Sequence, residues 1–417
     1  MKLKVLSLII AVFSAFSLLF VTASADESRI ETSMKSFSQT SGEIIGISSK
    51  GEWDTHPENS VPALIAAAET DIDFVAIDIK RTSDGVLIAF SDDTTERMLF
   101  CDEVFTISET SYEKLSYFPL RMGCGGSNEK ASEVTIPTLK EMLMIATDYD
   151  IPLILRCDAD CLTDVSERIS ELGASEMCIV MTDGKVKEIS SALSDVQEKP
   201  LIIGSIKGNV IFNIMSYING LDEAGAIGVQ LNTTNRYGIN YYRSLLSGYS
   251  EKMRVICDTT TPEISGFRED SEMYWSDLIS RGYSVIITDH ADRFCEYKTD
   301  CNETRAALQE LYDRYVTNHT LPDFKDEYLS DIKKAYTDAV SAAEALLGDA
   351  SSSLQDMQAC YSKLNKAAND VNKNFSSLED GSAGTTITPV RIALCVAAVI
   401  AVVVVQIYFF RRRKKVG

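Results

Sequence analysis

The stretch that decides the fold reads EIIGISSKGEWDTHPENSVPALIAAAET at residues 43–70 and FVAIDIKRTSDGVLIAFSDD at residues 74–93. The short apolar run at residues 44–47 ends in a Ser-Ser-Lys-Gly loop, which is typical of a buried parallel strand that leads into a helix. The pattern then predicts a helix around residues 63–68, a strand at 74–79, and a turn into a further strand at 86–90. This order indicates the beginning of an α/β fold.

The strand at residues 74–79 carries a carboxylate, Asp78, among apolar neighbours. Burying a carboxylate costs free energy unless the group has a partner or a chemical task. Asp78 is therefore the first candidate for a functional residue.

Apolar strand-like runs recur along the rest of the first three hundred residues, and helical patterns separate them. The runs lie at residues 152–157, 178–181, 201–206, 226–231, 253–257 and 284–288, and the helical patterns at 136–146, 162–172, 185–193, 210–221, 241–247 and 273–281. This alternation predicts a parallel sheet with crossover helices. Together with the two earlier strands it gives the strand number of a (β/α)8 TIM barrel. A long insertion at residues 94–133 is expected to lie over one end of the sheet.

After residue 302 the sequence pattern predicts only helices, up to about residue 375. A helix at residues 305–316 is expected to close the barrel, which we assign to residues 43–320. Apolar residues at helical spacing then predict an antiparallel pair of helices at 328–347 and 354–375. We expect this pair to form a separate all-α module at residues 321–375, and it resembles the small helical FIVAR module of bacterial surface proteins.

Both ends of the chain carry signals for the membrane. Residues 1–25 have two lysines, an apolar run and an Ala-Ser-Ala end, which predicts a cleavable signal peptide. Residues 26–42 are expected to be a spacer and residues 376–391 a linker. The apolar run at 392–410 is long enough to be a transmembrane helix, and the basic tail at 411–417 should stay cytoplasmic. We therefore expect a single-pass plasma-membrane protein with an extracellular N-terminal part.

Composition excludes some functions. The formal net charge is −21, which repels phosphate backbones and makes nucleic acid an improbable partner. The three histidines and the ten cysteines show no zinc-ligand spacing. Secretion permits disulfides, and the candidate local pairs are Cys101 with Cys124 and Cys295 with Cys301. Cys157 and Cys257 end apolar runs and are expected to be buried thiols.

Several of these segments together resemble the glycerophosphodiester phosphodiesterase family. SSKGEWDTHPENSVPALIAA is similar to that family's H-R-G and P-E-N opening, and AIDIKRTSDGVLIAFSDDTTER to its E-L-D-V, D-G and H-D-D-T-x-x-R segment. An I-P-T-L element at residues 136–139 and a T-D element ending at Asp289 extend the resemblance over roughly residues 43–293. The resemblance implies a TIM barrel of phosphodiesterase type, with two catalytic histidines and a metal ion held by carboxylates.

The residues on which that chemistry depends differ here. Ser49 and Ser91 stand where the resemblance places the two histidines, and serine has no useful acidity near neutral pH. Of the expected metal ligands only Asp78 remains, because Ala76 and Arg156 replace the other two. One carboxylate beside a guanidinium does not make a site for Ca²⁺ or Mg²⁺, so we expect no cofactor unless the protein is active.

The residues that remain suggest other roles. Arg156 is expected to pair with Asp78 in place of the metal, unless its side chain points elsewhere. Lys50 replaces the arginine of H-R-G and, with Arg156, is a candidate for binding an anion such as a phosphate group, the alternative being a solvated loop lysine. His290 and His56 are the histidines that could restore acid–base chemistry, although loop histidines are more often merely exposed.

Three functions follow. The first is a surface-anchored, phosphodiesterase-like barrel that is catalytically impaired and binds a phosphate-bearing small molecule or a surface partner. The second is an active phosphoric diester hydrolase with a rearranged site, acting on glycerophosphodiesters or related lipid or wall polymers. The third is an adhesin or structural surface protein in which the helical pair is the working part.

Overall fold

The computed structural model describes residues 27–40, 43–194, 196–206, 214–231, 252–260, 270–317, 330–349 and 352–379. The predicted signal peptide, transmembrane span and basic tail lie outside these ranges, as does the helix predicted at residues 241–247. Among the described residues, no helix combines the length and the apolar character that crossing a bilayer requires.

Eight parallel strands close into a barrel, as the sequence predicts. They are β1 (Ile45–Ser49), β2 (Phe74–Arg81), β6 (Leu153–Cys157), β7 (Cys178–Asp183), β8 (Leu201–Ile206), β9 (Gly228–Leu231), β10 (Arg254–Asp258) and β11 (Val285–Thr288). Each strand pairs with the next in sequence order, β11 pairs with β1, and the β1–β2 pairing closes the ring. Closure leaves no parallel edge exposed, and the carboxyl ends of all eight strands meet at one face.

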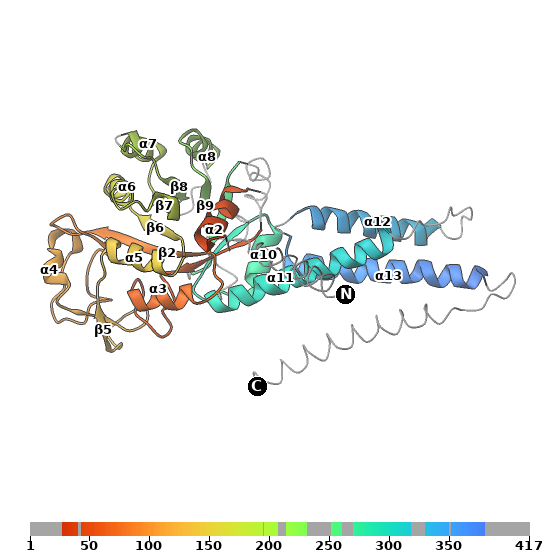
Figure 1. Cartoon of the computed structure of the whole chain (residues 1–417), viewed down its shortest axis with the longest axis horizontal. Coiled ribbons are helices and arrows are strands. Elements are labelled where there is room, and N and C mark those ends of the chain that lie inside the picture. The colour runs from red at the N-terminus through yellow and green to blue at the C-terminus, as the bar shows by residue number, and fades with distance from the viewer. Residues whose placement is uncertain are drawn as a thin grey trace, which may run out of the picture.

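Helices cover the outside of the barrel (Figure 1). They are α3 (Val61–Ala68), α5 (Leu139–Asp148), α6 (Leu162–Glu171), α7 (Val186–Ser194), α8 (Ile214–Glu223), α10 (Glu272–Ser280) and α11 (Ala291–Tyr312). Local chemistry fixes where they begin. Thr138 and Glu141 form a capping box at the start of α5, and the Ser60 hydroxyl accepts from the N–H of Ala63 at the start of α3.

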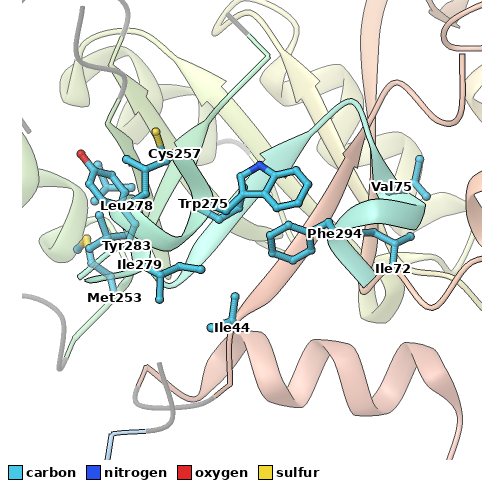
Figure 2. Packing of buried hydrophobic residues seen from close by; sticks show 14 of the residues in the cluster. Ile44, Ile72, Val75, Met253, Cys257, Trp275, Leu278, Ile279, Tyr283 and Phe294 are labelled. Atoms are coloured by element: carbon cyan, nitrogen blue, oxygen red, sulfur yellow. The ribbon is translucent and has the colours of Figure 1, made fainter. Parts of the chain in front are cut away.

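Two apolar layers hold the barrel together. The interior is filled by alternate residues of the strands, among them Ile47, Ala76, Ile154 and Ile256. A second layer lies between the sheet and the helices. Figure 2 shows part of it, where Trp275 of α10 meets Phe294 of α11 with ring centroids 5.1 Å apart.

Residues 26–42, which the sequence predicts to be a spacer, contain a helix, α2 (Arg29–Ser38), docked on the barrel. Phe37 of α2 is fully buried against Phe74, with ring centroids 5.4 Å apart, and belongs to the interior layer. The buried Arg254, at the start of β10, donates to the carbonyl oxygens of Ser36 and Phe37. α2 therefore closes the amino end of the barrel, opposite the face where the strands end. The polar composition of residues 26–42 concealed this, because one aromatic residue and backbone carbonyls make the contact.

The insertion after the β2–β3 hairpin has a small core of its own. After β3 (Leu87–Ala89) it contains a 3₁₀ turn (Ile107–Glu109), α4 (Tyr112–Leu115), β4 (Pro119–Arg121) and β5 (Ala131–Thr135). Leu99, Phe105 and Leu120 are among the residues buried in it. The N–H of Glu58 donates to the carbonyl of Gly123, so the insertion contacts the loop after β1 at the carboxyl end of the barrel.

The C-terminal helices pack against the helix that closes the barrel. α11 starts at Ala291, fourteen residues before the predicted start, and continues past the barrel into a bundle with α12 (Ser330–Gly348) and α13 (Leu354–Glu379). The predicted helical pair is confirmed, and α11 is its third member. Leu308 and Leu311 of α11 share one apolar cluster with the barrel helices and with α12 and α13.

Neither candidate disulfide is present, since Cys101, Cys124, Cys295 and Cys301 are all free thiols. Cys295 and Cys301 lie six residues apart on the straight helix α11, which places them on different faces. Cys157 and Cys257 are buried, as predicted.

Candidate functional site

A ring of polar side chains lies at the carboxyl ends of the barrel strands. Side chains two residues apart on a strand point to the same side. Ser49 follows the interior residue Ile47, and Asp78 follows the interior residue Ala76. Arg156 follows the interior residue Ile154 in the same way, so these side chains form the layer above the apolar interior.

The ion pair predicted between Asp78 and Arg156 is present. The two residues are direct neighbours in the β2–β6 register, and Arg156 Nε lies 2.7 Å from Asp78 Oδ1. Only 16% of the Arg156 side chain and 18% of the Asp78 side chain are exposed. The Nε–H does not point along the line to the oxygen and makes no regular hydrogen bond, so the contact is mainly electrostatic. A close, largely desolvated charge pair of this kind depends on both partners.

The outer edge of the guanidinium is held more loosely. Arg156 Nη1 lies 3.9 Å from Asp258 Oδ2, at the end of β10, and Nη2 donates to Ser49 Oγ at 3.4 Å. Asp258 also accepts from the hydroxyl of Thr260 at 2.6 Å. Arg156 thus connects three strands across the mouth of the barrel.

Electrostatics keeps this pair ionised. Burial raises the pKa of Asp78, but the charge of Arg156, then that of Lys50, and hydrogen bonds from Ser91 and Asn59 outweigh it and lower the pKa below its usual value. For Arg156, burial lowers the pKa, and the carboxylates of Asp78 and Asp258 more than compensate, so the pKa is raised. Both groups are charged across the physiological pH range.

The other oxygen of Asp78 is saturated by neutral donors. Ser91 Oγ lies 2.7 Å from Asp78 Oδ2, and Asn59 Nδ2 donates to the same oxygen at 3.3 Å. Asn59 Oδ1 accepts from the N–H of Asp78 at 3.0 Å, and its backbone adopts φ 54°, a conformation that asparagine tolerates. Ser91, at an expected histidine position, therefore serves as a hydrogen-bonding link.

Lys50 is not a solvated loop residue. Its Nζ lies 3.1 Å from Oε2 of Glu58, whose side chain is 1% exposed, and its backbone lies in the left-handed region at φ 62°. Glu58 Oε1 in turn lies 2.6 Å from Arg97 Nη2 and 2.8 Å from Ser91 Oγ. Glu58 therefore joins the loop after β1 to the insertion through Arg97.

A second acidic group lies at the end of β11, the strand between β1 and β10. Trp53 Nε1 donates to Asp289 Oδ1 at 3.0 Å, so Trp53, in the loop after β1, contacts the end of the neighbouring strand β11. The N–H of Asp289 donates to Asp270 Oδ2 at 2.6 Å. Burial raises the pKa of Asp289 to about 6, although the Trp53 hydrogen bond opposes the shift, and the neighbouring Asp270 and Asp258 add to it. Asp289 can exchange a proton near neutral pH.

His290 has a structural position. It precedes the first residue of α11, and its N–H donates to Thr288 Oγ1 at 3.0 Å. His56 is half-buried in the loop after β1. Neither histidine is among the side chains that contact Asp78 or Arg156 in the described part of the chain.

The donors present do not fit a divalent cation. Ala76 has no ligand atom, and the two carboxylates nearest the centre, Asp78 and Asp258, both face the guanidinium of Arg156. Within the described ranges no cluster of three or more His, Cys, Asp or Glu side chains is placed to hold a metal. A Ca²⁺ or Mg²⁺ ion would stand next to a fixed positive charge.

Sequence reasoning missed three residues of this site. Asp258 directly follows a predicted strand, a position that indicates the mouth of a barrel. Asn59 belongs to the P-E-N element, but the motif itself predicts no role for the Asn59 side-chain amide. Arg97 gave no signal, because its contact with Glu58 depends on how the insertion folds back.

Comparison with known proteins supports the fold and the resemblance. Residues 50–160, which include Asp78, Ser91 and Arg156, match the model of the Glycerophosphoryl diester phosphodiesterase family. A comparison with curated proteins gives no match. The structure resembles a glycerophosphoryl diester phosphodiesterase from Parabacteroides distasonis, with a TM-score of 0.52, 16% identity, and coverage of 64% of this chain and 90% of that one. A glycerophosphodiester phosphodiesterase from Agrobacterium tumefaciens gives a TM-score of 0.48 at 13% identity, covering 61% and 99%.

The resemblance to this family is thereby confirmed for the first strands of the barrel, where both the family model and the motifs lie. At these identities, the likeness to the Parabacteroides structure concerns the fold, a TIM barrel, and does not extend to its chemistry.

Proposed function

We propose that this protein is a membrane-anchored, glycerophosphodiester phosphodiesterase-like barrel on the cell surface that binds a phosphate-bearing small molecule or a surface partner without hydrolysing it. The observation that carries the proposal is the position of Arg156, whose Nε lies 2.7 Å from Asp78 at the centre of the mouth. A protein cation there takes the place in which a divalent ion would act.

Phosphodiester hydrolysis needs a cation at phosphorus, a base for the attacking hydroxyl and an acid for the leaving alkoxide. Ser49 is fully buried and receives a hydrogen bond from Arg156, while Ser91 is hydrogen-bonded between Asp78 and Glu58. A serine hydroxyl in either position does not exchange protons near neutral pH. The groups that replace the expected histidines therefore support a structural task.

Arg156 is also the group best placed to hold an anion. Asp78 engages its Nε, whereas Nη1 and Nη2 have only long contacts, at 3.9 and 3.4 Å. That outer edge of the guanidinium is the side that forms paired hydrogen bonds with phosphate or carboxylate oxygens. Lys50, which stays bound to Glu58, contributes charge nearby.

The membrane anchor rests on the chain ends. The apolar run at residues 392–410 and the five basic residues after it have the length and charge of a spanning helix with a cytoplasmic tail. Vesicle flotation of the full-length protein, compared with a chain ending at residue 379, tests this part.

Activity assays test the inactive site. The purified protein is expected to give no turnover of glycerophosphocholine or bis(4-nitrophenyl) phosphate with Ca²⁺, with Mg²⁺ or without metal. Glycerol 3-phosphate should nevertheless raise the melting temperature, and Arg156→Gln should abolish that shift. Metal-dependent turnover that disappears in Asp78→Ala would show that the protein is an active hydrolase.

One observation favours the second candidate, an active phosphoric diester hydrolase with a rearranged site. Asp289, with a pKa of about 6, can transfer protons near neutral pH, at the mouth of the barrel. If this candidate is correct, hydrolysis will be measurable and Asp289→Asn will remove it.

A further inference from the structure

We infer that the mouth of the barrel faces away from the bilayer that anchors the protein, so that its ligand comes from solution or from an opposing surface and not from a lipid of that bilayer. This inference rests on the proposed membrane anchor. It follows from the way in which α11 joins the barrel to the bundle.

α11 begins at the mouth and runs toward the opposite end of the barrel. His290, which precedes α11, is two residues beyond the end of β11. Lys298 Nζ then lies 2.6 Å from Asp73, the residue immediately before β2. Asp73 is at the amino end of the barrel, so α11 covers the depth of the barrel within its first eight residues, about 10 Å of helix. The remainder of α11 projects beyond the closed end.

The bundle is attached firmly to this projecting part. Arg305 donates to the carbonyl of Leu346 at 3.0 Å and to that of Asp349 at 2.8 Å, so the turn between α12 and α13 is held beside the middle of the projecting part of α11. The Tyr336 hydroxyl donates to the carbonyl of Tyr315 at 2.9 Å. α10 also contacts α13. The barrel and the bundle therefore form one elongated body.

α13 runs from this junction to the end of the molecule opposite the insertion, which is at the mouth (Figure 1). Its 26 residues correspond to about 39 Å of helix. The last residue of α13 therefore lies about 50 Å from the mouth along the long axis. The predicted anchor follows this distant end.

The linker cannot reverse that arrangement. For the mouth to face the anchoring bilayer, the end of α13 must stand about 50 Å above the bilayer. Residues 380–391 connect α13 to the predicted span, and a fully extended chain of that length reaches about 40 Å. A lipid head group of the same bilayer therefore does not reach the residues around Arg156.

Energy transfer to a labelled bilayer tests the orientation in the full-length protein. Cys124 is exposed, lies in the insertion next to the mouth, and can carry a donor dye added as a membrane-impermeant maleimide after reconstitution. The matched control is Cys124→Ser/Lys373→Cys, which carries the dye on an exposed position of α13. With an acceptor lipid in the bilayer, transfer from position 373 should exceed transfer from Cys124 severalfold. Adding about 20 Gly and Ser residues to the linker should raise transfer from Cys124.

The outcomes separate the inference from its premise. Flotation with vesicles and equal or stronger transfer from Cys124 would overturn the orientation and leave the anchor intact. Failure to float with vesicles would remove the anchor, and the inference with it. A second experiment compares two sources of the ligand. Soluble glycerol 3-phosphate should change the tryptophan emission of the reconstituted protein, whereas phosphatidylglycerol in the bilayer that anchors the protein should not. A response to the bilayer lipid would contradict the inference.

Discussion

Replacing Arg156 with methionine tests whether the guanidinium is the cation on which the mouth of the barrel depends. Methionine preserves the aliphatic bulk and removes the charge that lies 2.7 Å from Asp78. Asp78 keeps its contacts with Ser91 and Asn59, but both are neutral. The carboxylate is then left largely buried without an adjacent opposite charge.

The expected loss of stability is about 3 kcal/mol at pH 7.5, since breaking one side of a buried ion pair costs roughly 3–5 kcal/mol. We take the lower end of that range because about a sixth of each side chain is exposed, and because the carboxyl can respond by binding a proton, at about 1.4 kcal/mol for each unit of pKa.

The loss should depend on pH in a defined direction. In the native protein the pKa of Asp78 is lowered, so its stabilising contribution is present above the unfolded pKa and disappears as the pH falls through the folded pKa. In the variant the largest influence that lowers the pKa of Asp78 is gone, and burial, which raises this pKa, is opposed only by Lys50 and the hydrogen bonds from Ser91 and Asn59. The folded variant therefore binds a proton in a pH range in which the native protein does not, and the difference in stability between the two narrows as the pH falls from 7.5 toward 4.5.

Urea unfolding followed by tryptophan fluorescence measures the effect at both pH values. Arg168→Met is the matched control, because Arg168 forms an exposed i,i+3 pair with Glu171, and exposed pairs contribute less than about 1 kcal/mol. The double variant Asp78→Asn/Arg156→Met should recover part of the loss, since it removes the unpaired charge. The reasoning is refuted if Arg156→Met costs no more than the control, or if its cost is the same at pH 4.5 as at pH 7.5.

Three further predictions concern other parts of the molecule. Because the pKa of Asp289 is raised to about 6, ionisation of this carboxyl lowers the free energy of unfolding as the pH rises from about 4 to about 6. Asp289→Asn should remove this decline in stability and also a change in Trp53 emission centred near pH 6. An unaltered titration in the variant would contradict the assignment. Ala76→Glu/Arg156→Glu should create a Ca²⁺ site with Asp78. Ca²⁺ at 100 times its dissociation constant should then stabilise this variant by about 3 kcal/mol. The same Ca²⁺ concentration should leave the stability of the native protein and of an Ala76→Gln/Arg156→Gln control unchanged. Arg254→Met should destabilise the fold by about 2 kcal/mol or more, because the backbone carbonyls that close the amino end of the barrel lose their donor; a loss no larger than that of the exposed Lys35→Ala would show that the contact is dispensable.

The barrel and the pair at its centre could be predicted from the sequence because both depend on short-range patterns. Apolar runs alternating with helical patterns specify parallel strands, and parallel strands bring their carboxyl ends together. Asp78 and Arg156 stand at corresponding places on neighbouring strands, so the motif alignment was enough to pair them. The same logic predicts that Asp258 faces the mouth, although its contact with Arg156 was not anticipated.

The features that were not predicted depend on contacts between distant segments. Residues 29–38 form a docked helix because Phe37 packs in the barrel interior and the carbonyls of Ser36 and Phe37 accept hydrogen bonds from Arg254. Arg254 lies more than two hundred residues further along the chain. Cysteine spacing suggested a Cys295–Cys301 bridge only because the start of α11 was placed too late. Once both cysteines lie on one helix, geometry forbids the bond.

A guanidinium and a divalent ion both supply positive charge, but they leave different chemistry open. A bound metal keeps exchangeable positions at which water or a phosphoryl oxygen is polarised. Arg156 has no such position, and its Nε is already committed to Asp78 Oδ1, while Ser91 and Asn59 occupy Oδ2. Serine at position 91 and arginine at position 156 therefore act together, because between them both carboxylate oxygens of Asp78 are used inside the protein. Restoring a histidine at position 91 alone would leave the cation in place, and removing the arginine alone would leave serine at both expected histidine positions. Hydrolysis should accordingly return only when both positions are changed together with Ser49 and Ala76.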